Sequence, residues 1–554
     1  MDFQRIFLFL IFTFSAFLLW EAWQRSQLPP AQPIAQSAPK AASEAGVPSP
    51  TISASRPDVG VVADQQGKPA AQKTLSGQKI TVTTDYLVAE INTAGGDLRR
   101  VEFLHHYDIL DRNKPFVLLQ EMGAHTYITQ TGLLGNGLPT HNAIFSAQAT
   151  EYQLAEGRDS LEVRLSATDV TGAKVSKVYV FHRGSYLIDV GFEIENFGTD
   201  PLSSFAYYQL VRDKTPPEGD SMMLPTYTGT AVYTELEKFQ KVAFADIEKG
   251  KAKHSQQADN GWVGMLQHYF VSAWLPKDKV QREFYTKHLE NDLYSVGLIL
   301  PVDVIAPGQT AKINVPLYAG PAQASLDKIA PGLGLTVDYG WLTILSTPIF
   351  WLLSYLHGWV DNWGVAIILL TVLIKLAFFP LSAASYRSMG KMRVVAPKLE
   401  KIKQQYGDDR ERLHKAMMEL YKTEKINPLG GCLPVLIQIP VFIALYWAIL
   451  ASVEMRYAPF FGWITDLSVA DPYYVLPLIM GASMIIQSKL NPVPLDPLQA
   501  KLMKIMPVAF SVVFFFFPAG LVLYSVINNV LSIAQQWYIT RGLEAEAKGV
   551  AKSR

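Results

Sequence analysis

The chain lacks the residues that disulfide-bonded, zinc-binding or nucleotide-hydrolysing proteins need. Its 554 residues include one cysteine, Cys432, which excludes an intramolecular disulfide framework and every Cys-rich zinc pattern. No Gly-x4-Gly-Lys-Ser/Thr phosphate loop, no His/Glu pair at metal-ligand spacing and no Gly-x-Ser-x-Gly motif occurs. The ten histidines are dispersed, and we expect structural roles for them. We predict no catalytic residue, no cofactor and no metal site, so the chain is not expected to be an enzyme.

An excess of charge of one sign is also lacking. Lys and Arg number 49, and so do Asp and Glu, which gives a formal net charge of zero. Any affinity for an anionic surface must therefore come from local charge clusters. Apolar residues make up 49% of the chain, and the mean hydropathy is +0.13. This intermediate composition predicts a soluble part joined to a membrane part.

The N-terminal region joins an apolar run to a long stretch without aromatic residues. The run Ile6 to Trp20 resembles a signal sequence, but no small-x-small cleavage site closes it. We expect an uncleaved transmembrane anchor over residues 1–24, with a cleaved signal peptide as the alternative. No aromatic residue lies between Trp23 and Tyr86, and six prolines fall between positions 29 and 50. Residues 25–78 are therefore predicted to be a flexible tether, because they bury too little apolar area to offset their ordering entropy.

The hydrophobic period changes to two from about Lys79. One clear run alternates apolar with acidic residues: Ile188, Val190, Phe192 and Ile194 against Asp189, Glu193 and Glu195. Gly and Asn/Asp turn signals separate several such runs. Residues 79–335 are therefore predicted to form a large antiparallel β-sandwich, within which Thr234 to Phe244 is a candidate short helix.

Long apolar segments follow the predicted sandwich. Residues 336–362 are rich in Trp and Tyr and contain Pro348 and His357, which favours a helix lying in the membrane interface over a spanning one. Residues 363–540 are predicted to hold five spanning helices, which makes six with the anchor. The candidate spans are Trp363–Leu381, Leu433–Leu450, Tyr473–Ser488, Ile505–Phe517 and Leu521–Tyr538.

Local charge predicts the orientation of these spans. The segment 383–428 carries eleven Lys/Arg against six Asp/Glu, and 489–504 carries three against one. The short tail 541–554 carries four against two, whereas 451–472 has three acidic residues and one arginine. Positive charge remains on the cytoplasmic side, so both termini are predicted to be cytoplasmic and the β-domain periplasmic.

The basic segment 383–428 has the pattern of a helical hairpin. Pro397 is expected to open a first helix that ends at Gly407, and Asp408 to cap a second one, with Glu411 three residues on. The hairpin is either a solvated loop or a contact surface for anionic headgroups or ribosomal RNA. The candidate contact residues are Arg387, Lys391, Arg393, Lys398 and Lys401.

Lys375 is the candidate functional residue within a span. It lies inside Trp363–Leu381, about 9 Å from the cytoplasmic end at the helical rise. An ionisable group there is costly and usually faces a polar cavity; the alternative is that the lysine stem reaches the headgroups. Other spans carry polar residues on single faces, and together they predict a hydrated groove. The predicted groove residues are Lys375, Thr371, Gln438, Tyr446, Ser483, Gln487, Tyr524, Ser525, Asn528 and Gln535.

Several motifs resemble the YidC/Oxa/Alb insertase family. In the C-terminal half they are Lys425–Cys432, Gln438–Phe442, Asp471–Pro477 and Phe517–Tyr524. In the predicted β-domain, Trp262–Phe270 is similar to the periplasmic domain of the Gram-negative YidC branch. The resemblance covers essentially the whole chain.

The resemblance implies a polytopic α-helical membrane protein with six transmembrane helices and a β-supersandwich periplasmic domain. It implies a membrane protein insertase and chaperone of the bacterial inner membrane, acting alone or with the Sec translocon through a hydrophilic groove. The family's groove cation matches Lys375, where many relatives carry arginine, and its groove threonine matches Thr371. Many relatives have two successive tyrosines where this chain has Tyr524 and Ser525.

The resemblance also implies partners. They are nascent membrane-protein clients, the Sec translocon with its accessory subunits, and membrane lipids, but not DNA. The short, mildly basic tail 541–554 implies only weak ribosome contact. Two other classes compete with this interpretation: a secondary transporter with Lys375 as an anion site, and a membrane-anchored carbohydrate enzyme. No inverted repeat and no catalytic carboxylate–histidine arrangement supports them.

Overall fold

The computed structural model describes residues 46–50, 77–108, 111–123, 125–167, 172–217, 226–339, 342–407, 409–424, 433–491 and 497–552. Residues from Pro50 onward belong to one compact unit. The predicted anchor 1–24, nearly all of the tether 25–78 and the Lys425–Cys432 motif lie outside the described residues.

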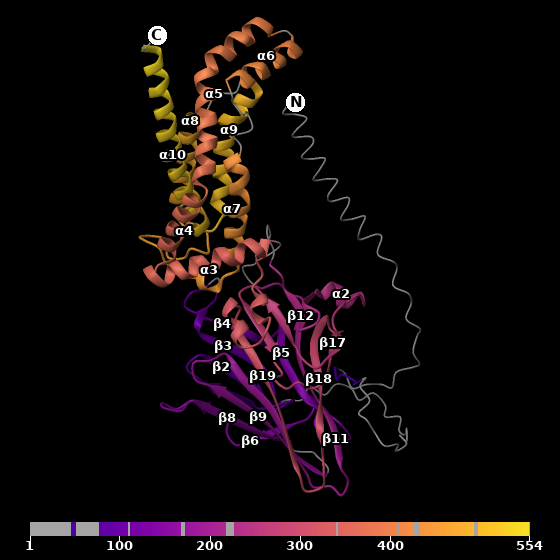
Figure 1. Cartoon of the computed structure of the whole chain (residues 1–554). Helices are drawn as coiled ribbons and strands as arrows, with labels where there is room; N and C mark the ends of the chain where they lie inside the picture. Colours follow the sequence, from indigo (N-terminus) through magenta and orange to yellow (C-terminus); the bar gives the residue numbers. More distant parts are fainter. Residues whose placement is uncertain are drawn as a thin grey trace. The chain divides into compact units, whose positions relative to one another are not determined.

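The strands that the structure describes form two large sheets (Figure 1). The first has ten strands in the order β14 (Gln257–Ala258), β17 (Arg282–His288), β18 (Leu293–Ile305), β11 (Leu202–Asp213), β5 (His125–Leu134), β4 (Pro115–Met122), β3 (Asp97–Tyr107), β2 (Leu87–Asn92), β1 (Lys79–Thr83) and β7 (Glu151–Gln153). The second has nine in the order β13 (Lys238–Val242), β12 (Gly229–Thr234), β15 (Trp262–Gln267), β16 (Phe270–Trp274), β19 (Thr310–Pro321), β10 (Leu187–Asn196), β9 (Ala173–His182), β8 (Ser160–Ala167) and β6 (Phe145–Ala147).

The period-two pattern explains how these sheets pack. In β10 the apolar side chains Ile188, Val190, Phe192 and Ile194 are all buried. They join one core cluster with apolar residues of the ten-stranded sheet, such as Val101 and Leu298, because alternate side chains of a strand point to one face. The pairs are antiparallel except β1 with β7, which is parallel. The predicted β-rich domain is therefore confirmed.

The candidate helix from Thr234 to Phe244 is wrong. These residues form the β12–β13 hairpin, with Tyr233 opposite Phe239, and a short helix α2 (Phe244–Glu248) follows it. The hairpin forms because β12 also pairs with β15, so tertiary pairing outweighs the local pattern.

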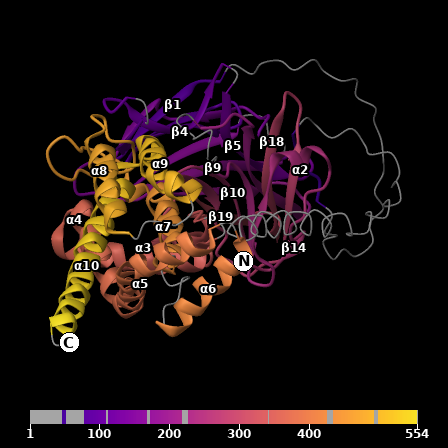
Figure 2. The same cartoon turned by 90° about the horizontal axis from the view of Figure 1, so that it is seen from above.

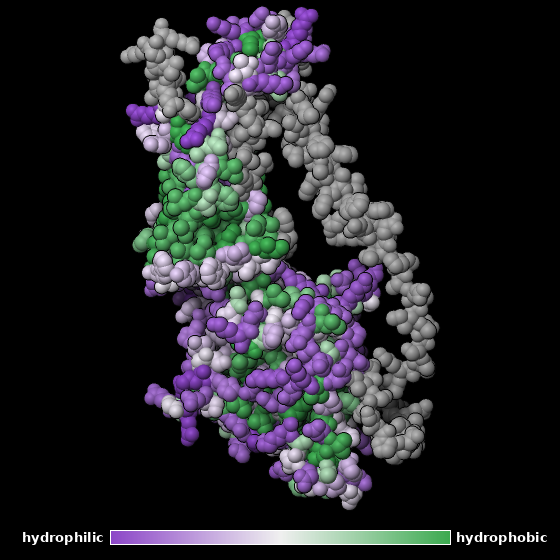
Figure 3. All heavy atoms as spheres, viewed as in Figure 1, coloured by the Kyte–Doolittle hydropathy of each residue, from purple (hydrophilic) through white to green (hydrophobic). Residues whose placement is uncertain are grey.

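Helices make up the C-terminal part (Figures 1 and 2). Their bounds are η1 (Ala324–Lys328), η2 (Leu333–Thr336), α3 (Thr343–Val360), α4 (Trp363–Ala377), α5 (Phe379–Tyr406), α6 (Arg410–Thr423), α7 (Leu433–Ala451), η5 (Val453–Met455), α8 (Val475–Leu490), α9 (Pro497–Val513), η6 (Phe514–Phe516) and α10 (Ala519–Lys552). Hydrophobic side chains gather over the bundle around α4 and α7, while the hairpin of α5 and α6 is mostly hydrophilic (Figure 3).

No one helix of the described chain combines the length and apolarity needed to cross a bilayer. The pair α4 and α5 meets both criteria together, with a bend of 67° at the break between them. Shorter apolar stretches lie at Gln438–Ala451, Val475–Leu490 and Ile505–Phe516. The six-span arrangement therefore stays a prediction.

The hairpin prediction is right in its pairing and wrong in two details. Helix α5 continues through Pro397 to Tyr406, so Pro397 does not open a helix. The cap of α6 is Asp409, whose side chain accepts hydrogen bonds from the backbone N–H groups of Glu411 and Arg412. Apolar residues of the two helices pack together as expected: Met392, Val395, Leu399, Met417, Leu420 and Tyr421.

Candidate functional site

Lys375 is the starting point of the candidate site. Its helix α4 is otherwise built of apolar residues, glycine and Thr371. The Lys375 ammonium donates a hydrogen bond of 2.6 Å to the Ser532 hydroxyl on α10. A small cavity beside it is lined by Ile374, Lys375, Phe378, Leu381, Ser382, Gln438 and Val441. This half-buried cation in an apolar setting therefore donates to a neutral oxygen.

Helix α10 carries further polar contacts to two other helices, α7 and α8. Gln438 on α7 donates to the Tyr524 hydroxyl, and Asn529 donates to Ser483 on α8 over 2.7 Å. Gln536 donates to the backbone carbonyl of Leu490 and to the side chain of Asn491, each over 3.1 Å. We call the side chains of Lys375, Ser532, Gln438, Tyr524, Asn529 and Ser483 the polar cluster. Such contacts between helices stabilise packing and also create a polar path within an apolar bundle.

Some predicted groove residues make only local or peripheral contacts. Thr371 and Ser525 each donate to a backbone carbonyl four residues earlier in their own helix. Tyr446 packs its ring against Phe517, with centroids 5.5 Å apart. Gln535 donates to the Phe379 carbonyl over 3.4 Å.

Two further predicted groove residues have no described side-chain hydrogen bond. The side-chain oxygen of Asn528 is buried without a partner, and Gln487 is half-buried on α8.

Sequence reasoning missed Ser532 and Tyr386. Ser532 contacts Lys375, and Tyr386 on α5 hydrogen-bonds to Ser532. The spacing of Ser532 was a usable signal, because it lies four residues after Asn528 and seven after Ser525 on the same helical stripe. No comparable signal marks Tyr386, which reaches α10 only through the bend between α4 and α5.

Comparison with known proteins identifies the family. The YidC periplasmic domain matches residues 79–352, and the 60Kd inner membrane protein family matches residues 355–546. A membrane protein insertase YidC from Nitrosospira multiformis is 56% identical over 567 residues, and one from Methylobacillus flagellatus is 54% identical over 559. Both alignments cover 100% of this chain and of the relative. The chain belongs to the YidC family of membrane protein insertases.

Family membership indicates the bacterial inner membrane and a periplasmic β-domain. Similarity to solved structures is weaker than similarity in sequence. A YidC insertase crystal structure with its first transmembrane domain resolved aligns with 84% of this chain and 93% of its own, at 19% identity and a TM-score of 0.38. A galactose mutarotase related enzyme from Lactobacillus acidophilus aligns with 44% and 97%, at 10% identity and a TM-score of 0.29. Both TM-scores are low, so membership in the YidC family rests on sequence.

The hairpin residues predicted as contacts are only partly paired. Lys398 forms a 2.6 Å ion pair with Glu424 across the hairpin. Arg393 donates to the Lys489 carbonyl over 3.0 Å. Arg387, Lys391 and Lys401 are exposed and give the hairpin of this YidC family member a basic surface.

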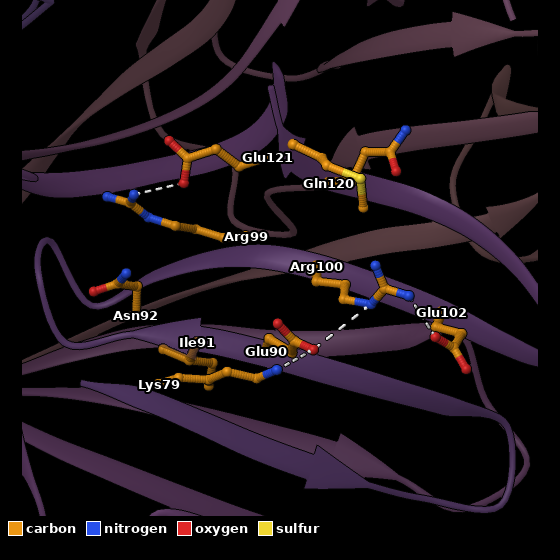
Figure 4. Close-up of a pocket in the computed structure, with 10 residues that line it drawn as sticks. Lys79, Glu90, Ile91, Asn92, Arg99, Arg100, Glu102, Gln120 and Glu121 are labelled. Carbon is orange, nitrogen blue, oxygen red and sulfur yellow. Dashed lines mark hydrogen bonds and ion pairs between the residues drawn. The ribbon is translucent and has the colours of Figure 1, made fainter. Parts of the chain in front are cut away.

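A shallow cavity of about 520 Å³ lies on strands β1 to β4 of the periplasmic domain (Figure 4). Its charged side chains point toward one another: Lys79 and Arg100 approach Glu90, Arg100 also pairs with Glu102, and Arg99 pairs with Glu121 at 2.6 Å. Each carboxylate that lines this cavity therefore has a cationic partner.

A contact region joins the β-domain to the segment between α7 and α8. The Arg456 guanidinium donates to the Tyr107 carbonyl over 2.6 Å. Four aromatic rings surround it at 5.2 to 5.8 Å from their centroids: Phe116, Tyr269, Phe270 and Tyr457. Arg112 adds a 3.3 Å ion pair to Asp466, and His268 donates to the Leu450 carbonyl over 2.9 Å. Together these bonds attach the β-domain to the helical part.

Two titratable groups make this contact pH-dependent. Burial raises the pKa of Glu454 to about 7. Burial, together with the charges of Arg456 and His105, lowers the pKa of His106 to about 4. In the unfolded chain the corresponding values are near 4.3 and 6.5. The native state therefore keeps Glu454 protonated and His106 neutral at mildly acidic pH.

We expect the stability of the contact to be nearly constant between about pH 4.3 and 6.5, because the contributions of Glu454 and His106 oppose each other there, and to fall outside this range. Above it, ionisation of Glu454 is favoured in the unfolded state, so stability falls as pH rises through 7. Below it, the unfolded state binds a proton at His106 first, so stability falls toward pH 4. The measurement is the urea midpoint of the full-length protein in detergent across this range. Glu454→Gln should leave a stability that rises from about pH 4 to 6.5, and His106→Gln one that falls from about pH 4.3 to 7; flat profiles in both variants would contradict the two assignments.

Proposed function

We propose that this chain inserts nascent inner-membrane proteins and helps them fold, and that the polar cluster lines the groove that receives them. A client span enters from the cytoplasm, its polar flank is held near Lys375, and its apolar part moves into lipid. The observation that carries this proposal is the Lys375 ammonium, which lies in an apolar helix and, within the described part of the chain, hydrogen-bonds only to the neutral Ser532 hydroxyl. A cation without a carboxylate partner attracts the acidic part of a client.

The energetics favour this route without nucleotide hydrolysis. A twenty-residue span gains roughly 0.3 to 0.6 kcal/mol for each strongly apolar residue that enters the bilayer. The barrier is the polar flank, whose transfer through hydrocarbon is expensive. A polar cluster inside the helical bundle lowers that barrier because it replaces lipid with hydrogen-bonding groups along part of the path.

Charge and aromatic residues support the proposed orientation. Helix α3 exposes Trp351, Tyr355 and Trp359 on one stripe, with neighbouring ring centroids 5.8 and 5.2 Å apart. Aromatic side chains at helical spacing suit the membrane–water interface, so α3 lies along the periplasmic face. With the basic segments in the cytoplasm, the chain has six spans and two cytoplasmic termini.

The same arrangement supports the proposed partners. The exposed bases Arg387, Lys391 and Lys401 attract anionic headgroups and contribute a weak ribosome contact. Client proteins enter beside them. From the family resemblance we also propose that the chain acts alone or beside the Sec translocon, and that it serves as a chaperone.

Insertion into proteoliposomes tests the proposal. The client is a short membrane protein with one aspartate in its translocated segment, and protease protection measures insertion. We expect wild-type protein to insert the client, and Lys375→Ala to reduce the yield about tenfold, which corresponds to about 1.4 kcal/mol of lost stabilisation. The reason is that the client carboxylate loses its counter-charge inside the bundle.

Lys375→Arg is the matched control. It keeps the charge and presents a planar fork that binds a carboxylate through two parallel hydrogen bonds, so its yield should equal or exceed that of wild type. Equal insertion by wild type and Lys375→Ala would show that Lys375 is not part of the site, whereas the proposed insertase function would stand. A correctly folded wild-type protein that inserts no Sec-independent client would overturn independent insertion.

A further inference from the structure

Ser532 stands out because it links three helices through one hydroxyl group. It lies on α10, accepts from Lys375 on α4 over 2.6 Å and hydrogen-bonds to Tyr386 on α5. Its side chain is nearly inaccessible, since the residue is 5% exposed. Lys375 is the predicted groove residue whose side chain contacts the Ser532 hydroxyl.

The hydrogen-bond pattern determines which atoms of Ser532 face the lysine. The Ser532 hydroxyl donates its own hydrogen to the Asn528 carbonyl, one turn earlier, over 2.8 Å. A serine hydroxyl has one hydrogen and two lone pairs. Because this hydrogen bonds within α10, the lone pairs of the oxygen accept hydrogen bonds from other groups. The Lys375 ammonium is one such donor.

A lysine needs such an acceptor if its charge is to occupy one position. Its ammonium sits on a flexible four-carbon stem, so an isolated Lys375 would sample many rotamers, including those that reach toward the headgroups. The Ser532 oxygen is fixed by α10 and by its own bond to Asn528, and it therefore selects the rotamers that keep the ammonium inside the bundle.

The acceptor is also electrically neutral. A carboxylate at position 532 would hold the ammonium equally well but would cancel its charge. With Ser532 as partner, the charge of Lys375 stays available, because the hydroxyl that accepts its hydrogen bond is neutral. The junction thus combines a fixed position with an uncompensated cation.

We propose that Ser532 is a positioning residue that holds the Lys375 ammonium within the groove and thereby sets the preference of the insertase for clients with acidic translocated segments. This inference rests on the proposed function. The partner class that it selects is a carboxylate-bearing polypeptide segment, because a carboxylate gains more than a neutral acceptor from a cation held at one point.

Ser525 offers a matched control on the same helix. It lies two turns before Ser532, is equally buried at 5% exposed, and donates to the backbone carbonyl four residues earlier, over 2.8 Å. Ser525 and Ser532 make the same kind of hydrogen bond within α10. Lys375 donates a hydrogen bond to Ser532 and not to Ser525. Replacing either serine by alanine therefore removes the same local bond, and only one replacement releases the lysine.

The experiment compares two clients that differ by one residue, aspartate or asparagine in the translocated segment, in proteoliposomes of the full-length protein. The readout is the ratio of acidic to neutral client inserted. Ser532→Ala should lower this ratio about tenfold, the scale of one hydrogen bond to a charged group, and Ser525→Ala should leave it within about twofold. Ser532→Thr keeps a hydroxyl that bonds back within a helix and should restore the ratio.

A double-mutant cycle separates positioning from packing. In a Lys375→Ala background, Ser532→Ala should change the ratio no further, because the group that it positions is gone. An equal loss of both clients in Ser532→Ala would overturn the proposal by showing a purely structural role. A ratio that falls in Lys375→Ala but persists in Ser532→Ala would overturn it while leaving the proposed function intact. If wild type inserts neither client, the proposed function itself fails.

Discussion

Asp97→Asn is expected to lower the free energy of unfolding of the β-domain by about 3–5 kcal/mol, the cost of removing one partner from a buried ion pair. Lys177 on β9 and Asp97 on β3 belong to different sheets and are 0% and 1% exposed. Their charged atoms are 3.2 Å apart, and Lys177 also donates to the carbonyls of Gly95 and Thr131 at 3.0 and 3.4 Å. Without the carboxylate, the lysine charge would be buried among neutral groups.

The pH dependence of this variant follows from the same pair. Burial lowers the pKa of Lys177, and Asp97 opposes that shift. With asparagine in place, the opposition disappears and the native pKa falls further below the unfolded value near 10.4. The unfolded state then binds the proton more tightly, so the variant should regain stability as pH rises toward 10.

Urea unfolding of the full-length protein in detergent, read by pulse proteolysis, measures the loss. Asp97→Leu combined with Lys177→Met removes both charges and should lose less stability than Asp97→Asn, since no buried charge is left unpaired. Glu90→Gln at the partly exposed pair with Lys79 should cost less than about 1 kcal/mol. A loss below about 1 kcal/mol for Asp97→Asn would show that Lys177 sheds its proton or finds other partners.

Arg456→Ala is the second large effect we expect, a weakening of about 2–4 kcal/mol in the attachment of the β-domain to the α7–α8 segment. Its hydrogen bond to the Tyr107 carbonyl involves a charged donor, which is worth about 1.5–3 kcal/mol. The four surrounding rings add cation–π attraction of up to about 2 kcal/mol where water is excluded. Alanine would lose both and would leave a void among the rings.

Hydrogen exchange on the ends of β3 and β4 and on residues 456–471 of the full-length protein would measure this effect. Protection should fall in Arg456→Ala while strands remote from the contact keep theirs. Arg112→Ala is the control at the same contact: that side chain is 48% exposed, so its loss should cost less than about 1 kcal/mol. Asp466 would still accept two hydrogen bonds from Ser468. Equal effects of the two variants would contradict a special role for Arg456.

Local pattern was sufficient for much of the fold. The alternation in β10 predicted its buried face correctly, and the helix signals in 383–428 predicted the pairing of α5 and α6. It failed at Thr234–Phe244 and at Pro397. In the first case the hairpin is held by the strand beside it. In the second, α5 began eighteen residues earlier at Phe379 and continued through the proline.

For the site, the sequence indicated Lys375 and the polar face of α10, because a charge or amide in an apolar helix is conspicuous. It did not predict the partners. Thr371 and Ser525 bond within their own helices, whereas Ser532 bonds to Lys375. A serine four residues beyond an asparagine looks the same in either role, so spacing alone does not separate them.

The sequence by itself determined the family, the β-rich and helical halves, the basic and acidic segments and the cation at position 375. These depend on composition, period and motif, which are properties of neighbouring residues. Only the tertiary structure shows that Ser532 meets both Lys375 and Tyr386, that Asp97 pairs with Lys177, and that aromatic rings enclose Arg456. Each of these contacts joins residues far apart in the chain, and their geometry follows from how helices and sheets pack, a long-range property that local pattern does not encode.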